Sequence, residues 1–112
     1  MSKKTMAIPS DPDFDRLQKD YQATISKKLS DLSDLIEAVR KAPSLETLTA
    51  LRFIVHKLAG NAGVFGYIEV SQMCKQFEWY LVQQLQAPLK LDPKLLEECD
   101  RYFQKIKQLY TL

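Results

Sequence analysis

The feature that most constrains the fold is the spacing of apolar residues, which recur at intervals of three or four along nearly the whole chain. This spacing is typical of helices that bury one face, and no segment shows the two-residue alternation of a strand. Three interruptions divide the pattern: Pro43, the glycines Gly63 and Gly66, and the segment QAPLKLDP at residues 86–93. We therefore expect four helices and no sheet.

The first helix is predicted from a start signal, a long apolar stripe and a proline stop. Ser10 or Asp11 is expected to cap it, with Pro12 at an early helical position, and Pro43 is expected to end it. The start signals leave open a break, or a short extra helix, near the N-terminus. The stripe comprises Phe14, Leu17, Tyr21, Ile25, Leu32, Leu35 and Val39.

The second helix is expected to begin after Ser44, a good N-cap residue that is followed by Thr47. Glycines near the end of a helical pattern usually serve as caps, so Gly63 and Gly66 are expected to close this helix. Its inward stripe consists of Leu48, Leu51, Val55, Leu58 and Ala62.

Two further helices complete the pattern. The third is expected to run from about Tyr67 and to carry the apolar residues Val70, Met73, Phe77, Leu81 and Leu85. The fourth is expected to begin near Asp92 and Pro93 and to carry Leu95, Leu96, Cys99, Tyr102, Phe103, Ile106 and Leu109. Because the connections are short, the predicted fold is all-α, an antiparallel up-and-down four-helix bundle.

A chain of 112 residues is long enough for one domain with a core and too short for two. Hydrophobic residues make up 46% and charged residues 27%, which are values of a globular protein and not of a disordered one. We expect a flexible N-terminal segment at residues 1–10 and a single domain at residues 11–112. The start at Met1 favours a free-standing protein, although a cloned fragment would look the same.

The distribution of charge argues against several kinds of partner. Sixteen basic residues are spread among fourteen acidic ones, so neither a nucleic acid nor an anionic membrane surface is an expected partner. No apolar run is long enough to span a bilayer, and the start of the chain lacks the apolar middle of a signal peptide, so a cytoplasmic location is expected. Cys74 and Cys99 have no close Cys or His to complete a metal set, and we expect reduced, partly buried thiols.

The predicted second helix contains the single histidine of the chain, His56. At about 100° per residue, the residues that fall opposite the inward stripe, and so face water, are Arg52, Phe53, His56, Gly60 and Gly63. A glycine inside a helix costs ~1 kcal/mol relative to alanine, and Gly60 lies before the stripe ends, so it does not look like a cap. We interpret Gly60 as leaving open surface beside His56, on which the backbone of a partner protein can approach the ring, with Phe53 as an apolar docking residue.

A lone surface histidine is usually only a surface residue, so its chemistry has to be considered against that default. A metal site would need further ligands, and a hydrolytic site would need a nucleophile and an orienting acid around the base. Neither set is found around His56. A single exposed imidazole can nevertheless act alone as a nucleophile toward a phosphoryl group.

The segment HKLAGNAGVFGY, residues 56–67, resembles the motif of histidine-containing phosphotransfer (HPt) domains of two-component phosphorelays. In that family the histidine is followed by leucine two places on, glycine four places on and glycine ten places on, and Leu58, Gly60 and Gly66 match. The resemblance, which covers nearly the whole chain, implies that His56 accepts a phosphoryl group from a receiver-domain aspartate and passes it on. The implied partners are response-regulator receivers and a hybrid sensor histidine kinase.

The same resemblance implies a phosphocarrier without kinase activity. Such modules do not bind ATP, and no phosphate-cradling glycine loop is found in the sequence. The receiver supplies the acidic pocket and Mg²⁺, so no cofactor is expected on this chain. A monomer is expected.

One residue departs from the family pattern. Many members carry a lysine three places after the histidine, where this chain has Ala59. Lys57 or Arg52 is a candidate to replace its charge, and a solvated helix face is an equally good reading of both. In some members, a carboxylate or amide twenty-two places after the histidine contacts the other ring nitrogen, and Glu78 occupies this position in the chain. Glu78 would then fix the tautomer and leave Nε2 as nucleophile, unless it is an ordinary surface acid.

Two other classes of function remain open. In one, the domain binds receivers but has lost efficient phosphotransfer, with Ala59 as the trace of that loss. In the other, the bundle is an unrelated helical adaptor that presents Phe53, Phe65, Tyr67 and Trp79 to a protein groove. Phosphotransfer requires His56, whereas either alternative would survive its replacement by glutamine.

Overall fold

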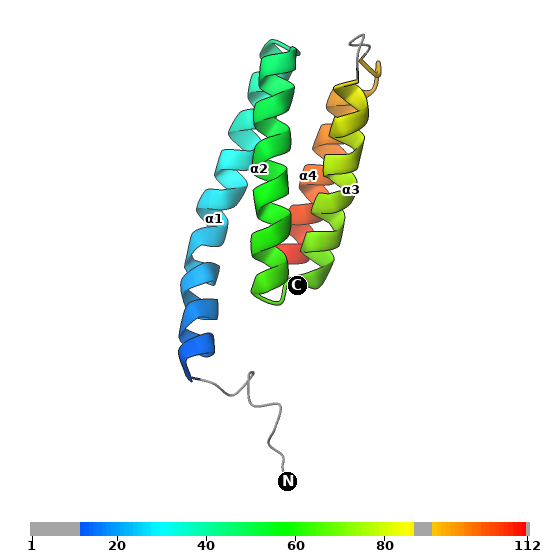
Figure 1. Cartoon of the computed structure of the whole chain (residues 1–112). Coiled ribbons are helices and arrows are strands. Elements are labelled where there is room, and N and C mark those ends of the chain that lie inside the picture. The colour runs from blue at the N-terminus through cyan, green and yellow to red at the C-terminus, as the bar shows by residue number, and fades with distance from the viewer. Residues whose placement is uncertain (1–11, 87–90, 112) are drawn as a thin grey trace.

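The computed structural model describes residues 12–86 and 91–111. It contains four helices (Figure 1): α1 (Pro12–Lys41), α2 (Leu45–Val64), α3 (Ile68–Gln84) and α4 (Leu95–Tyr110). No strand occurs in these two ranges, so the predicted all-α class is confirmed. The predicted flexible segment 1–10 and the predicted caps Ser10 and Asp11 lie outside the described residues.

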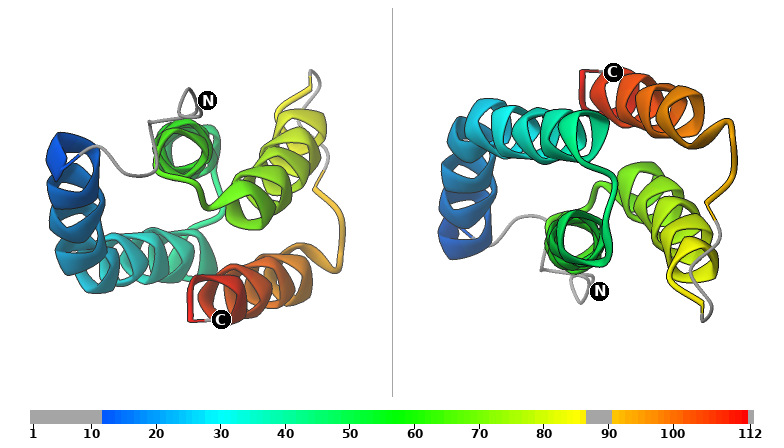
Figure 2. Two further views of the ribbon diagram at one scale, coloured as in Figure 1. Left: turned by 90° about the horizontal axis from the view of Figure 1, so that it is seen from below. Right: turned by 90° about the horizontal axis from the view of Figure 1, so that it is seen from above.

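The helices run alternately up and down and form a ring when seen along the bundle (Figure 2). Helix α2 contacts α1 and α3, and α4 likewise contacts α3 and α1. The predicted antiparallel up-and-down bundle is therefore correct. Short connections place each helix beside the next one in sequence, and contact between α1 and α4 closes the ring.

Helix α1 is continuous over 30 residues, so its described part includes no separate short helix. Its described part starts at Pro12, which agrees with the early helical position expected of this proline. Its first turns extend past the connection between α2 and α3 (Figure 1), which leaves Leu17 48% exposed. The assignment of Leu17 to the buried stripe is therefore wrong, because none of the other described helices extends beside the first turns of α1 (Figure 1).

Helix α1 also changes direction along its length (Figure 2). In this region the hydroxyl of Thr24 donates to the carbonyl oxygen of Tyr21 at 2.7 Å. A side chain that bonds to the preceding turn competes with the helical ladder and commonly bends a helix. Helix α1 contacts both α2 and α4.

Helix α2 begins as predicted. The side chain of Ser44 accepts from the backbone N–H of Thr47 at 3.1 Å, and the hydroxyl of Thr47 accepts from the backbone N–H of Ser44 at 3.0 Å. This reciprocal capping box satisfies two backbone donors that the helix leaves free. All five residues of the predicted inward stripe are buried.

The two glycines at the end of α2 have different roles. Gly66 follows the helix with φ of +89°, a left-handed conformation that favours glycine, so it closes the helix as predicted. Gly63 lies inside the last turn of α2, and its predicted role as a cap is wrong. A Cβ atom at position 63 would lie 3.3 Å from Oγ of Ser71, so the glycine allows the start of α3 to approach closely.

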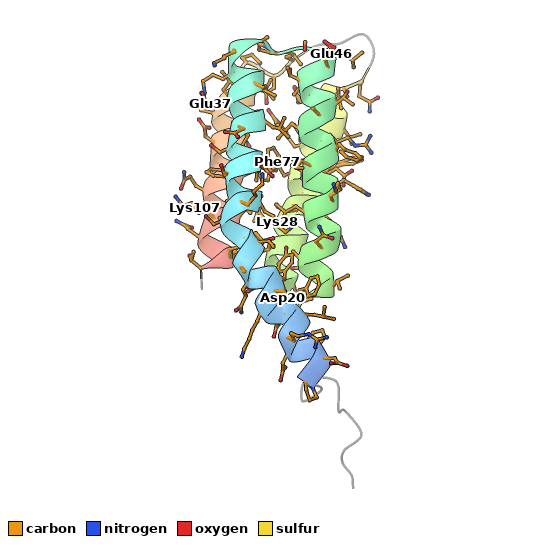
Figure 3. All side chains as sticks on the ribbon, turned by 90° about the vertical axis from the view of Figure 1, so that its left-hand side faces the viewer. Asp20, Lys28, Glu37, Glu46, Phe77 and Lys107 are labelled. Atoms are coloured by element: carbon orange, nitrogen blue, oxygen red, sulfur yellow. The ribbon has the colours of Figure 1, made fainter. Side chains whose placement is uncertain are left out.

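The core lies between all four helices, with Phe77 fully buried at mid-height (Figure 3). Glu37 and Lys107, by contrast, project from the outside of the bundle (Figure 3). Burying each large apolar side chain contributes about 1.5 to 3 kcal/mol, so the core dominates the stability of the fold. Cys74 and Cys99 are buried free thiols, and burial raises the pKa of each to about 12.

An aromatic cluster fixes the connection between α2 and α3 to the rest of the bundle. The ring of Tyr21 stacks on Phe65 at 4.6 Å between centroids, and Tyr67 meets Tyr110 edge-on at 5.2 Å. The hydroxyls of Tyr21 and Tyr110 lie 2.6 Å apart in a buried hydrogen bond. Phe65 and Tyr67 therefore pack against the core, and the expectation that they are presented to a partner is wrong.

Candidate functional site

His56 lies near the middle of α2 on the face that points away from the core. Its helix neighbours Val55 and Leu58 are buried, whereas the side chain of His56 is 69% exposed. The 3.6-residue period requires this alternation, because the stripe that packs inward fixes which residues point outward. As predicted, Arg52, Phe53 and Gly60 are also exposed.

Glu78 of α3 holds one nitrogen of the imidazole. Both carboxylate oxygens of Glu78 lie 3.0 Å from Nδ1 of His56. The Glu78 side chain is only 16% exposed, so this carboxylate is largely withdrawn from water. The contact predicted between Glu78 and the ring is thus present, and it joins the two helices.

Arg52 approaches the same carboxylate from one turn earlier on α2. Its Nε donates to Oε2 of Glu78 at 3.2 Å. Glu78 therefore lies between a guanidinium and an imidazole, and its carboxylate contacts both groups. We predicted Arg52 as a source of positive charge near His56, but not its pairing with Glu78.

The geometry indicates which ring nitrogen of His56 carries a proton. An ionised carboxylate only accepts hydrogen bonds, so the contact requires the ring proton to be on Nδ1. Nε2 then keeps its lone pair, on a side chain that reaches into solvent. A neutral imidazole with a free lone pair at a fixed position is a suitable nucleophile.

The surface around the ring is open on two sides. A Cβ atom built on Gly60 would meet no heavy atom within 4 Å, so free space lies one turn after His56. On the other side, a hollow is lined by Thr49, Arg52, Phe53 and His56. The ring of Phe53 is 62% exposed at the edge of this hollow.

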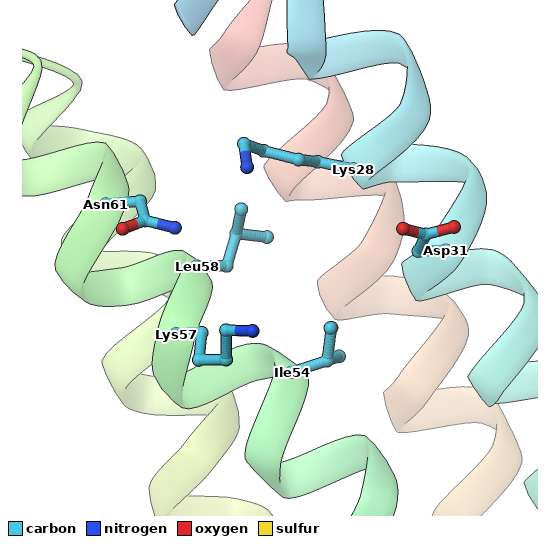
Figure 4. Close-up of a pocket in the computed structure, with 6 residues that line it drawn as sticks. All are labelled: Lys28, Asp31, Ile54, Lys57, Leu58 and Asn61. Carbon is cyan, nitrogen blue, oxygen red and sulfur yellow. The ribbon is translucent and has the colours of Figure 1, made fainter.

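Lys57 is not part of the array of Arg52, Glu78 and His56. Its ammonium lies 5.4 Å from the centre of the Phe53 ring, in a cation–π contact within α2. Lys57 also lines a groove between α1 and α2, into which Lys28 of α1 extends toward Asn61 (Figure 4). Arg52 and Lys57 were the two candidates to replace the missing lysine. Arg52 contacts Glu78, whereas the contact given for Lys57 is with Phe53.

Ala59 and Gly63 lie on the side of α2 that meets α3. Ala59 is buried, and its carbonyl oxygen accepts from the hydroxyl of Ser71 at 2.8 Å. Gly63, which the helical period placed facing water, is half-buried beside Ser71. The expectation that Gly63 faces water is wrong because the start of α3 covers it.

Several residues of the site were not predicted. Thr49 lines the hollow before His56, and Ser71 ties α3 to α2 one turn after it. No sequence pattern marks either residue. The opposite charges of Arg52 and Glu78 were the available signal for their ion pair, but the register between α2 and α3 was needed to recognise it.

Within residues 12–86 and 91–111, no group of three or more His, Cys, Asp or Glu side chains is placed to hold a metal ion. In the same ranges no helix is both long and apolar enough to cross a membrane.

Nearly the whole chain matches a known protein family. The model of the Hpt domain family matches residues 13–109, which is nearly the whole chain. No curated protein and no solved structure gives a match.

Proposed function

The chain belongs to the Hpt domain family, whose members are phosphotransfer modules of two-component signalling and not kinases, and we propose that His56 is its phosphoacceptor. The proposed donor is the aspartyl phosphate of a receiver domain, either in a response regulator or in a hybrid sensor kinase. The proposed acceptor is an aspartate of another receiver. Mg²⁺ would be held by the receiver, so this chain would need no cofactor.

The observation that carries the proposal is the contact between Nδ1 of His56 and Glu78 at 3.0 Å. It leaves Nε2 as the one ring nitrogen with a free lone pair. Because the His56 side chain is 69% exposed, the ring is accessible to a receiver from solvent. The open space at Gly60 and the exposed ring of Phe53 support docking around the ring.

In the proposed step, the lone pair of Nε2 attacks phosphorus. The bond between phosphorus and the aspartyl oxygen breaks, and its electron pair returns to the aspartate as a carboxylate. The proton on Nδ1 stays in place, so the phosphorylated ring gains a positive charge that faces Glu78. Transfer to the next receiver reverses these bond changes, which suits a carrier that has to give up its phosphoryl group easily.

The test uses receiver domains from the same organism, phosphorylated on aspartate with a labelled small-molecule phosphodonor. We expect label to move to this protein in an acid-labile, base-stable form, because the new bond joins phosphorus to nitrogen. His56→Gln should abolish the transfer while leaving the helical signal and the melting temperature unchanged. Label that persists in His56→Gln would refute the assignment of His56.

The second candidate function is receiver binding without efficient transfer, which the alanine at position 59 favours. It predicts that a receiver binds the parent and the His56→Gln variant with equal affinity and that no label moves. Measuring affinity and label transfer on the same receiver panel therefore separates the two candidates.

A further inference from the structure

Glu78 has two hydrogen-bond partners, and only one of them is the ring. One carboxylate oxygen, Oε2, lies 3.0 Å from Nδ1 of His56 and 3.2 Å from Nε of Arg52. His56 and Arg52 come from successive turns of α2, whereas Glu78 comes from α3. The carboxylate is therefore held from two directions by one helix.

Contact with two partners matters because the terminal torsion of a glutamate side chain rotates easily. Rotation about this torsion is broad and has no deep staggered wells, so a carboxylate held only by a ring nitrogen can turn away from it. A donor fixed on Oε2 removes that freedom. The guanidinium is well suited, because its donors lie in a rigid plane and its charge does not change with pH.

The burial of Glu78 increases the importance of the second partner. Its side chain is 16% exposed, while those of Arg52 and His56 are 48% and 69% exposed. A carboxylate that water barely reaches depends on its protein partners for hydrogen bonds. Without Arg52, the partners that the structure gives Glu78 reduce to the imidazole alone.

We propose that Arg52 is a positioning residue for His56 that acts through Glu78. By holding Oε2, Arg52 fixes the carboxylate that keeps the ring proton on Nδ1, and so keeps Nε2 free to receive the phosphoryl group. This role rests on the proposed function of His56 as phosphoacceptor. It differs from direct stabilisation of the phosphoryl charge, because the contact of Arg52 is with the residue that holds the opposite ring nitrogen.

The first test is spectroscopic and needs no phosphoryl donor. Because the chain contains one histidine, ¹⁵N-histidine labelling gives one pair of ring signals, which report the tautomer directly. In the parent at about pH 8, we expect the tautomer with the proton on Nδ1 to predominate, because Glu78 contacts this nitrogen. Arg52→Gln should shift the signals toward a mixture of both tautomers, and Arg52→Lys should retain part of the parent pattern.

Arg101→Gln is the matched control. Arg101 is 51% exposed and pairs with Glu98 at 2.8 Å on α4, so its loss removes a similar surface ion pair far from the ring in sequence. It should leave the ring signals unchanged. Exposed pairs contribute little to stability, so Arg101→Gln should melt near the parent temperature. Parent-like ring signals in a folded Arg52→Gln variant would overturn the proposal.

The second test separates positioning from direct action on the phosphoryl group. Arg52→Gln should slow phosphoryl uptake by roughly five- to tenfold. In a Glu78→Ala background the same substitution should cause no further slowing, because its effect passes through Glu78. Slowing that is equally large with and without Glu78 would show that Arg52 acts on the phosphoryl group, and would overturn the proposal.

The two tests also distinguish this role from the proposed function. If no receiver phosphorylates the parent protein, the proposed function fails, and the tautomer measurement still decides whether Arg52 controls the ring through Glu78. If the parent is phosphorylated but the ring signals and double-mutant kinetics do not couple Arg52 to Glu78, only the positioning role fails.

Discussion

Substitutions at Gly60 are expected to change stability and function in opposite directions. Gly60 is an exposed residue inside the helix, and a Cβ atom there meets no heavy atom within 4 Å. Replacing it by alanine therefore adds no clash and removes backbone freedom from the unfolded chain. We expect Gly60→Ala to stabilise the fold by about 0.5 to 1 kcal/mol, which corresponds to a rise in melting temperature of about 2 to 6 °C.

A larger side chain should have opposite effects on stability and function. Gly60→Leu introduces a good helix former into the same open space, so the melting temperature should equal or exceed that of the parent. The leucine would occupy the surface beside His56 on which a receiver has to settle. Since about 1 Å of misplacement can cost ~100-fold in rate, phosphoryl uptake should fall by about two orders of magnitude. Gly60→Ala should be intermediate in uptake.

Gly63 and Gly66 provide controls for the stability measurement. Gly63→Ala would place Cβ 3.3 Å from Oγ of Ser71, which is bonded to Ala59 and would have to yield by a few tenths of an ångström, so this change should stabilise less than Gly60→Ala. Gly66→Ala would force alanine into a left-handed conformation at a cost of about 1 to 2 kcal/mol. Thermal melts and label-transfer rates of the four variants form the assay. A folded Gly60→Leu variant that transfers at the parent rate would refute the docking interpretation.

Three further outcomes are expected. Tyr21→Phe should lower the free energy of unfolding by about 1 to 3 kcal/mol in urea titrations, because it leaves the buried hydroxyl of Tyr110 without its partner; no loss would show that this bond contributes nothing. Burial raises the pKa of the Cys74 and Cys99 thiols to about 12, so the folded state keeps protons that the unfolded chain releases. The free energy of unfolding should therefore fall as pH rises from about 9 toward 12. Replacing both cysteines by alanine should flatten this pH dependence, and an unchanged slope would show that the two thiols do not cause it. Lys57→Gln should change the rate of phosphoryl uptake less than about twofold, since Lys57 contacts Phe53 and lies outside the array of Arg52, Glu78 and His56. A larger loss would support Lys57 as the replacement for the missing lysine.

The fold could be predicted from the sequence because each helix carries its own local signals. The stripe of α2 and its capping box at Ser44 require no knowledge of the other helices. Leu17 and Gly63 were misplaced for the opposite reason. Whether a residue on an apolar stripe is covered depends on where the neighbouring helix ends, and no local pattern contains that information.

The site was predictable only in part for a similar reason. The outward position of His56 follows from the helical period, and its contact with Glu78 was expected from the family resemblance. The ion pair between Arg52 and Glu78 depends on the register between α2 and α3, which is set by packing. Phe65 and Tyr67 also look exposed in the sequence, but packing against Tyr21 of α1 and Tyr110 of α4 partly buries both rings.

The most direct test of the central claim is to identify the nitrogen that carries phosphorus. The ¹⁵N-histidine-labelled protein is phosphorylated by a receiver and observed by ¹⁵N and ³¹P NMR, and the single histidine makes the assignment unambiguous. Because Glu78 holds Nδ1, we predict one product, with phosphorus on Nε2 and the proton still on Nδ1. Phosphorus on Nδ1, or on any residue other than His56, would contradict the account.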